Sequence, residues 1–558
     1  MKRRKSKWVK LIIGLLVCVG ALSLMAAGGQ DRSGGAVANS AANVNPPGVF
    51  PICKEPITLN AVIRQDNSVE NYDTNAYTKL LEEKGNLKLN IEVYPTGNPG
   101  MEKLLVQVAG GGVLPEAFIN FGFSQEVMLN LGTEGVALKL NDYYDKWAYY
   151  FSEQIKKVTT ISNIMELMHS ADGNMYYMPY IHEQLTENLS LRGWMNKQWL
   201  DNLGLRMPAT TAEFRTVLEA FRDRDPNRNG RRDEIPAAGA TDGRARLHDF
   251  LINAFIYNDT RDRLIVNNGR VDVIFNKPEY REGVRYVRDL MADGLILDTL
   301  FTINQPQLRA VVEQESFSTI GFLTGGIAGI FSPNNANKLE YVPMAPLRGP
   351  QGAQFTPWMP QGPGSFYVIT KDCKNPEAAF RLGDFMCSEE ASVWNRYGVP
   401  NVDWIAARPN DKPLYNVAGY PLLFKPVLNW GSTQNSHWSQ GAACIIPQNI
   451  QFGQVAPDDP LDINYPIAAA VPLMHGKEAP FENRVDFTVF TFQEMEAIAD
   501  LKNNINTYVN ENLAFFITGQ RSIDRDWDAY VRELERIGLQ RYIQLQQSGY
   551  ERAIGRKR

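Results

Sequence analysis

The ten residues from Asp225 to Glu234 carry the clearest chemical pattern in the chain, Asp-Pro-Asn-Arg-Asn-Gly-Arg-Arg-Asp-Glu. Side-chain oxygens recur at positions 1, 3, 5, 9 and 10 of this segment, and Gly230 at position 6 permits a sharp turn. Such spacing can fold several hard oxygen ligands around one point, which is the environment that Ca²⁺ requires. We therefore predict a calcium site with a structural role. Its ligands are Asp225, Asn227, Asn229, the carbonyl of Arg231, Asp233 and Glu234.

This loop is shorter than an EF-hand, in which a glutamate at position 12 binds the ion through both oxygens. Position 12 is Pro236 here, so Glu234 has to take that role. The alternative interpretation is a turn rich in Asp and Asn, a common feature after helices.

The elements around the loop predict an α/β fold. Residues 57–63, 87–93 and 116–120 are typical of strands, and 75–84 and 101–108 between them are typical of helices. Further strands are expected at 318–323 and 365–370, and further helices at 214–221, 280–293, 375–386 and 526–537. Alternating strands and helices form doubly wound parallel sheets, whose ligands gather at the carboxyl ends of the strands. Arg64, Gln65 and Phe123 follow such ends and are candidate ligand contacts.

Aromatic residues make up 11% of the chain, and several stand in expected loops. Sugar rings present apolar C–H faces that stack on aromatic planes, so these residues are candidate carbohydrate contacts. The candidates are Tyr177, Trp194, Trp358, Trp430 and Trp438, with core packing as the alternative for each. An anionic sugar would also need a cation, for which Arg64, Arg192 and Lys197 are available.

Length and charge limit the class of protein. A chain of 558 residues exceeds one ordinary core, so at least two lobes are expected. Its net charge of −5 favours neither nucleic acid nor an anionic membrane as partner. The four cysteines beyond the N-terminal region, Cys53, Cys373, Cys387 and Cys444, form no CxxC motif, and no disulfide pairing is predicted.

The N-terminus has the layout of a secretory signal peptide. Residues 1–10 are basic, 11–25 are apolar, and small residues follow at 26–29, which predicts a signal peptide over 1–28. An apolar run of ~15 residues is too short to span a bilayer. Residues 29–55 are rich in Gly, Ser, Ala and Asn and predict a flexible linker. We expect an exported protein, in the periplasm or on the outer face of the cytoplasmic membrane.

The segment 194–211, followed by the loop at 225–234 and by Ile235-Pro236, resembles the family 1 extracellular solute-binding proteins. Within that family it is similar to the large lipoprotein-type branch that includes alginate-oligosaccharide-binding receptors. Segments 109–116, 134–140, 172–179 and 516–539 fit the same resemblance. The resemblance implies two α/β lobes joined by hinge strands and closing like a clamshell, delivery of ligand to ABC importer permeases, and the same six calcium ligands.

We therefore expect lobe 1 to comprise 56–170 with 366–408, and lobe 2 to comprise 171–365 with 409–558. The expected function is a monomeric solute-binding receptor that captures an oligosaccharide between its lobes. No nucleophile elbow, HExxH motif or phosphate loop occurs, so no enzyme activity is predicted. An exported glycan hydrolase and a stand-alone surface protein that binds carbohydrate or peptide are the alternatives.

Overall fold

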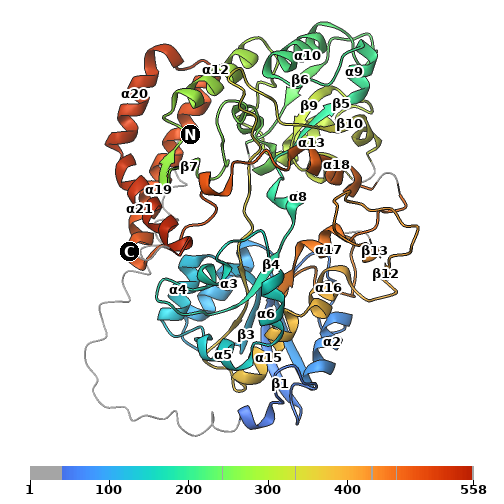
Figure 1. The fold of residues 1–558 in the computed structure, drawn as a ribbon, viewed down its shortest axis with the longest axis vertical. Coiled ribbons are helices and arrows are strands. Elements are labelled where there is room, and N and C mark those ends of the chain that lie inside the picture. Colours follow the sequence, from blue (N-terminus) through green and yellow to red (C-terminus); the bar gives the residue numbers. More distant parts are fainter. Residues whose placement is uncertain (1–39, 242, 333–334, 429–430, 460–461, 556–558) are drawn as a thin grey trace, which may run out of the picture.

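The computed structural model describes residues 40–241, 243–332, 335–428, 431–459 and 462–555, which form two α/β lobes arranged along the long axis of the molecule (Figure 1). The predicted signal peptide lies outside these residues. None of the described helices is long and apolar enough to cross a membrane. Cys53, Cys373, Cys387 and Cys444 carry free thiols.

Lobe 1 is built on a six-stranded sheet with the order β14-β4-β11-β3-β1-β2. β1 pairs in parallel with β2 and β3, as the alternation of strands and helices predicted, whereas β11 runs antiparallel to β3 and β4. The strands are β1 (Ile57–Arg64), β2 (Leu87–Tyr94), β3 (Ala117–Phe123), β4 (Met178–His182), β11 (Gly364–Ile369) and β14 (Cys444–Ile446). The helices are α2 (Ala76–Gly85), α3 (Asn98–Ala109), α4 (Gln125–Thr133), α5 (Asn141–Trp147), α6 (Tyr150–Gln154), α7 (Ile164–Met168), α15 (Pro376–Met386) and α16 (Glu389–Tyr397), with 3-10 turns at Ala41–Asn43 and Ile155–Lys157.

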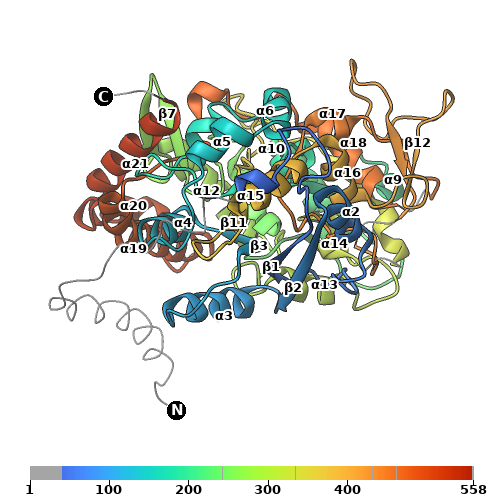
Figure 2. The same cartoon turned by 90° about the horizontal axis from the view of Figure 1, so that it is seen from below.

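Each face of this sheet is covered by helices (Figure 2). Successive side chains of a strand point to opposite faces, and β1 follows this rule. Ile63 packs in a core that includes Phe380 of α15, whereas Val62 packs in a separate core that includes Leu104 of α3. The sheet is therefore buried on both sides, which explains the nearly continuous apolar sequence of its central strands.

Lobe 2 contains a four-stranded sheet with the order β10-β5-β9-β6, in which only β6 and β9 are parallel. Its strands are β5 (Gly193–Asn196), β6 (Ile235–Ala238), β9 (Ile320–Thr324) and β10 (Tyr341–Met344), beside the hairpin of β7 (Leu264–Asn267) and β8 (Arg270–Val273). The helices are α9 (Lys197–Leu203), α10 (Thr211–Asp223), α11 (Leu247–Ile252), α12 (Pro278–Ala292), α13 (Gln305–Val312), α14 (Ile327–Ile330) and α18 (Asn464–Met474), with 3-10 turns at Gly243–Ala245, Ala336–Glu340 and Phe481–Asn483.

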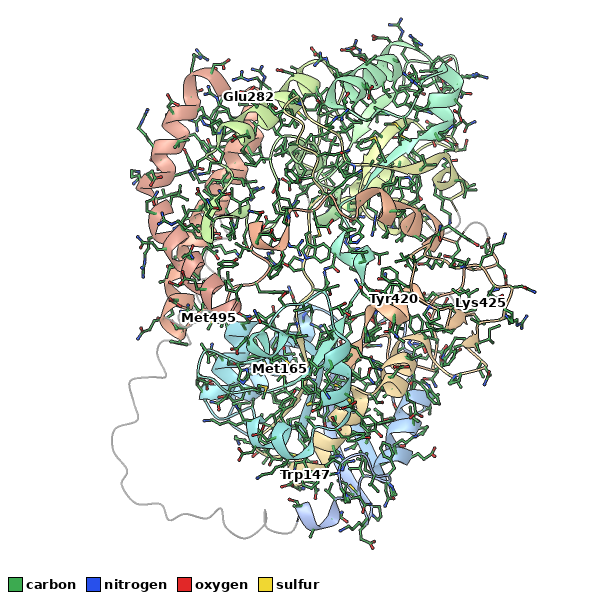
Figure 3. All side chains as sticks on the ribbon, viewed as in Figure 1. Trp147, Met165, Glu282, Tyr420, Lys425 and Met495 are labelled. Carbon is green, nitrogen blue, oxygen red and sulfur yellow. The ribbon has the colours of Figure 1, made fainter. Side chains whose placement is uncertain are left out.

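Three long helices at the C-terminus, α19 (Phe492–Ile517), α20 (Ile523–Arg536) and α21 (Leu539–Ala553), flank lobe 2 (Figure 1). α19 packs on α12, and the three helices share the main core of lobe 2. Met495, near the start of α19, lies at the level of lobe 1 (Figure 3). On the other side of lobe 1, an arm contains β12 (Trp404–Ala406), β13 (Phe424–Pro426) and α17 (Gln448–Phe452).

The boundary between lobe 1 and lobe 2 that the sequence predicted at residue 171 differs from the boundary in the structure. β4 and β14, which were both expected in lobe 2, are strands of the lobe 1 sheet, where they pair with each other in parallel. The chain crosses to lobe 2 only after His182. Strand pairing over more than 260 residues leaves no local signal, so the sequence pattern did not place this boundary.

The prediction of a flexible linker over 29–55 is wrong for its described part, residues 40–55. Ile52 and Cys53 are fully buried in the lobe 1 core, and the Ile52 amide donates to the Lys84 carbonyl at 2.9 Å. The guanidinium of Arg381 donates to the carbonyls of Asn45 and Pro46 at 2.6 and 2.7 Å. The buried guanidinium of Arg381 needs hydrogen-bond acceptors, and the backbone carbonyls of residues 40–55 supply them. These bonds hold the segment in one conformation although it is rich in small residues.

His437 gives lobe 1 a predicted pH dependence. The side chain is 5% exposed, and its Nδ1 accepts a hydrogen bond from the Ser439 amide at 2.9 Å. Burial lowers the pKa of His437 to about 4. The neutral ring therefore stabilises the folded state above the ordinary histidine pKa, and this contribution is lost as the pH falls from about 6.5 to about 4. We expect a loss of about 2–3 kcal/mol in the free energy of unfolding over that window.

Urea unfolding of the wild type and of His437→Gln at pH 7 and pH 4.5 measures this contribution. Because glutamine stays uncharged, the variant should lose less stability than the wild type on acidification. His475→Gln is the matched control, since that side chain is 58% exposed. Equal losses in the wild type and His437→Gln would show that another group controls the acid response.

Candidate functional site

The predicted calcium loop lies between α10 and β6 in lobe 2. A capping box starts α10, with the Thr210 hydroxyl accepting from the Glu213 amide and Glu213 accepting from the Thr210 amide. After the helix, Pro226 of the loop is anchored to α9, because its carbonyl accepts from the Asn202 side chain at 2.8 Å. Gly230 has a φ of +74°, the left-handed conformation that glycine adopts without strain.

The predicted ligands turn inward around one another. Asp225 accepts the amides of Asn229 and Gly230 at 3.0 and 2.9 Å. The Asn229 side chain in turn lies 3.0 Å from Asp233. Rotation of an asparagine amide by half a turn exchanges its nitrogen and oxygen. Such a rotation would direct a carbonyl oxygen of Asn229 toward the centre of the loop.

Glu234 provides the test of whether a cation fits. Its Oε1 is buried and has no hydrogen-bond partner in the described structure. Burial raises the pKa of Glu234, and the nearby carboxylates of Asp233 and Asp225 raise it further. An orphaned carboxylate oxygen whose pKa is raised by two further carboxylates suits a divalent cation. Across the described residues, however, no three His, Cys, Asp or Glu side chains are gathered closely enough to be recognised as a metal site.

Two of the chain segments that connect the lobes lie side by side and form a hinge. One is residues 183–192, which contain the short helix α8 (Leu185–Asn188), and the other is residues 356–363. The Met359 amide donates to the Asn188 carbonyl at 2.8 Å, and the Asn188 side chain donates to the Met359 carbonyl at 2.9 Å. These reciprocal bonds join the two crossings.

A cavity of about 300 Å³, which we call the hinge pocket, opens beside this hinge. It is lined by Gly243, Arg244, Arg246, Asp259, Thr260, Arg261, Trp358, Met359, Pro360 and Val485. One aromatic plane together with several charged groups is the composition expected of a carbohydrate site.

Two polar atoms of the hinge pocket residues are left without partners in the described structure. Asp259 uses Oδ1 to accept the amides of Arg261 and Arg263 at 3.1 and 2.6 Å, while its Oδ2 is buried and unpaired. Burial raises the pKa of Asp259 to about 6. The Nε1 of Trp358 is also buried and unpaired, and the Arg484 guanidinium lies 4.4 Å from the centre of the Trp358 rings. Asp259 and Trp358 both line the hinge pocket, and the unpaired atom of each is buried in this conformation.

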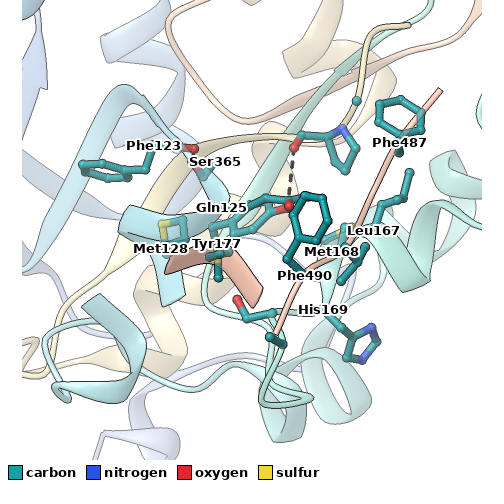
Figure 4. Close-up of a pocket in the computed structure, with 16 residues that line it drawn as sticks. Phe123, Gln125, Met128, Leu167, Met168, His169, Tyr177, Ser365, Phe487 and Phe490 are labelled. Atoms are coloured by element: carbon teal, nitrogen blue, oxygen red, sulfur yellow. Dashed lines mark hydrogen bonds between the residues drawn. The ribbon is translucent and has the colours of Figure 1, made fainter. Parts of the chain in front are cut away.

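A smaller cavity of about 100 Å³ lies at the carboxyl end of β3 (Figure 4). Phe123 and Tyr177, both predicted ligand contacts, line it together with Phe487, Phe490 and Met495 from the C-terminal part of the chain. The Tyr177 hydroxyl lies 3.5 Å from the Pro363 carbonyl on the hinge. Phe123 and Tyr177 are only 6% and 7% exposed, and Trp358 of the hinge pocket is likewise 6% exposed. All three side chains therefore offer a ligand little surface in this conformation, and movement of the lobes would have to uncover more of them.

The carboxyl edge of the lobe 1 sheet also carries an aromatic pair that the sequence analysis did not select. The rings of Tyr180 and Phe366 stack with their centres 4.6 Å apart, and both residues are partly exposed. The Tyr180 hydroxyl donates to the Gln440 side chain at 2.6 Å. One signal in the sequence could have identified Phe366. Side chains alternate along the strand expected at 365–370, so Phe366 and Tyr367 had to lie on opposite faces of the sheet.

The other predicted ligand contacts are dispersed. Arg64 is partly buried and lies near Gly122 and Phe366, whereas Gln65 is exposed. Trp194 and Trp438 are fully buried in cores, with their Nε1 atoms bonded to the Gly325 carbonyl and the Thr78 hydroxyl at 2.7 and 2.9 Å. Both are therefore core residues, as the alternative interpretation allowed. Trp430 lies outside the described residues.

The two remaining candidate cations are not free to bind a ligand. Arg192 is 2% exposed and donates to the Thr186 carbonyl, and burial lowers its pKa to about 10. Lys197 pairs with Asp201 at 2.5 Å on α9.

Two α/β lobes, a double hinge and a pocket beside it define the class of proteins that bind a solute between two lobes. The chain belongs to the bacterial extracellular solute-binding protein family, whose model matches residues 66–393. The predicted family and the two-lobed α/β fold are thereby confirmed.

Among curated proteins, the chain is 28% identical over 469 residues to the fructooligosaccharide ABC transporter substrate-binding protein FusA of Streptococcus pneumoniae serotype 4, covering 81% of this chain and 82% of FusA. It is 22% identical over 423 residues to the polygalacturonan/rhamnogalacturonan-binding protein YtcQ of Bacillus subtilis, covering 72% and 74% of the two chains. These relatives bind different kinds of glycan.

Solved structures agree with this assignment. The S. pneumoniae FusA complex with kestose superposes with a TM-score of 0.69 at 25% identity, covering 90% of this chain and all of that one. An EF-hand mutant of FusA with fructo-nystose also gives a TM-score of 0.69 at 24% identity, with the same coverage. Alginate-binding protein AlgQ2 gives a TM-score of 0.61 at 20% identity over 90% of this chain and all of AlgQ2. The expected likeness to alginate-binding receptors is therefore confirmed at the level of the fold.

Proposed function

We propose that this protein is the exported receptor of an ABC importer and captures an oligosaccharide in the hinge pocket between its lobes. The observation that carries the proposal is the composition of that pocket, in which the indole of Trp358 lies among arginines and the unpaired Oδ2 of Asp259. Sugars combine apolar C–H faces with hydroxyls, so they match both kinds of group. The FusA relative, which binds fructooligosaccharides, supports the ligand class.

The aromatic pair of Tyr180 and Phe366 supplies the lobe 1 side of the proposed site. Glu187 on α8, in the hinge segment that follows β4, pairs with Arg244 of the hinge pocket. Arg64, Gln65, Phe123 and Tyr177 stay in the proposal as outer contacts at the sheet edge. Closing the lobes would bring such groups together on a bound sugar.

The proposed receptor has no catalytic step. It acts as a monomer, in the periplasm or on the outer face of the cytoplasmic membrane, and passes its ligand to the permease subunits. The basic and apolar N-terminal sequence supports export.

A thermal-shift screen with neutral and uronic oligosaccharides, followed by calorimetry on each hit, tests the receptor role. We expect a concentration-dependent rise in melting temperature with at least one oligosaccharide, because ligand binding stabilises the folded state. Sugar chains recovered intact after incubation would agree with a receptor. Hydrolysis of an oligosaccharide that causes no thermal shift would instead support the hydrolase alternative.

We further propose that Ca²⁺ occupies the loop at 225–234 and that its role is structural. Asp225, Asn227, Asn229, the Arg231 carbonyl, Asp233 and Glu234 would hold it. The buried, unpaired Oε1 of Glu234 supports this proposal, as does the existence of an EF-hand in the FusA relative. When bound, the ion would neutralise three carboxylates that otherwise repel one another.

A further inference from the structure

We propose that the hinge pocket selects uncharged oligosaccharides and excludes those that carry carboxylate, sulfate or phosphate groups. This inference rests on the proposed function, since it takes the hinge pocket to hold the sugar. Its basis is that the arginines of the pocket are already paired with acidic side chains or carbonyls of the protein.

The pair between Arg244 and Glu187 is the central observation. Arg244 lies in lobe 2 and donates through Nη2 to Glu187, which lies on the hinge helix α8. Their side chains are 42% and 33% exposed, so the pair is accessible from the pocket without being fully solvated. The charge of Arg244 is thereby balanced before any ligand arrives.

The other arginines at the pocket are balanced in the same way. Arg246 donates to the Thr260 carbonyl at 2.7 Å and lies 3.5 Å from Asp249. Arg261 donates to Asp262 at 3.1 Å and to the Asp486 carbonyl at 3.0 Å.

Behind the Trp358 ring, Arg484 pairs with Asp486 through two bonds of 2.8 and 3.1 Å. Each of these four arginines thus has a carboxylate neighbour, and Asp259 adds a further carboxyl group to the pocket wall.

An anionic sugar would gain little in such a pocket. Its charge would lose water, and each cation that could compensate is already engaged by a protein carboxylate. The unpaired Oδ2 of Asp259 would also repel it or would have to take up a proton. No net positive potential attracts an anion here, in contrast to sites built for carboxylates or phosphates.

A sugar hydroxyl, by comparison, carries no charge and needs no compensating cation. It can donate or accept a hydrogen bond as the neighbouring polar group requires, whereas an ionised carboxylate can only accept. Buried groups left unpaired reject an analogue that lacks the matching donor. The paired arginines of the pocket therefore favour a neutral sugar over a charged one.

Calorimetry with three trisaccharides tests this inference: kestose and maltotriose, which are neutral, and trigalacturonate, which is anionic. We expect the wild type to bind a neutral trisaccharide and to bind trigalacturonate at least tenfold more weakly. In Glu187→Gln, Arg244 loses its balancing charge. The affinity for trigalacturonate relative to the neutral trisaccharide should then rise by about tenfold, and this gain should shrink at high salt.

Glu219→Gln is the matched control, because Glu219 also pairs with an arginine, Arg215, but on the exposed side of α10. Its relative affinities should equal those of the wild type. An unchanged ratio in Glu187→Gln would overturn the role of the Glu187–Arg244 pair.

The remaining outcomes separate the inference from the proposed function. Tighter wild-type binding of trigalacturonate would overturn the inference and leave the receptor role intact. If Arg64→Gln then removed that binding, Arg64 at the lobe 1 edge would be the cation responsible, since no described carboxylate forms an ion pair with it. Failure of every oligosaccharide in the wider screen would overturn the proposed function itself.

Discussion

Replacement of Trp358 by alanine should weaken oligosaccharide binding by about a hundredfold, equivalent to about 2.7 kcal/mol. Trp358 is the aromatic side chain that lines the hinge pocket, so the substitution removes the apolar surface on which we propose that a sugar ring stacks. Calorimetry with the tightest-binding oligosaccharide from the thermal-shift screen measures the change.

Trp358→Phe keeps an aromatic plane of smaller area and removes the Nε1 donor. We expect it to lose about tenfold in affinity, the effect of one hydrogen bond left unmade. Tyr149→Ala is the control for loss of an aromatic side chain, since Tyr149 is 48% exposed on lobe 1 and lines neither pocket.

The Trp358 variants also need melting curves, because this side chain packs in a small core beside the hinge. Wild-type affinity in a folded Trp358→Ala would place the sugar elsewhere.

Removal of calcium should lower the melting temperature of the wild type by about 10 °C. An ion present at a thousandfold above its dissociation constant stabilises the folded state by about 4 kcal/mol, and each kcal/mol shifts the melting temperature of a domain of this size by about 2–4 °C. The loop joins α10 to β6, so its loss loosens lobe 2 at the edge of the four-stranded sheet. Melting curves with calcium and with EGTA measure the shift.

Glu234→Gln should melt at the same temperature with calcium and with EGTA, because it lacks the buried carboxylate that completes the proposed site. The matched control is Asp223→Asn, which alters an acidic residue two positions before the loop and should keep the full response to EGTA. A wild type that melts equally with and without calcium would show that the segment is only a turn rich in Asp and Asn.

Local patterns in the sequence were reliable guides to local structure. The helix expected at 214–221 and the strand–helix alternation from 57 to 120 both appear as predicted. Each depends on residues a few positions apart, whose hydrogen bonds and apolar spacing are set by helix or strand geometry. The family resemblance rested on the same kind of contiguous segment.

Local sequence patterns did not predict which of the candidate aromatic residues line a pocket and which are buried in a core. Trp194 and Trp438 stood in segments with the composition of a binding loop, yet both are fully buried in the lobe cores. Trp358 was chosen for the same reason and lies at the hinge pocket. Composition alone could not separate these tryptophans, because burial depends on which distant elements pack against them.

The sequence by itself determined the spacing of oxygen ligands at 225–234, the α/β class and the family, because these features depend on neighbouring residues. Only the tertiary structure decided that Glu187 meets Arg244, that Asn188 meets Met359, and that β4 and β14 complete the sheet of lobe 1. These contacts join residues 57 to more than 260 positions apart. No local preference encodes them, since each forms only when segments distant in the sequence pack against one another.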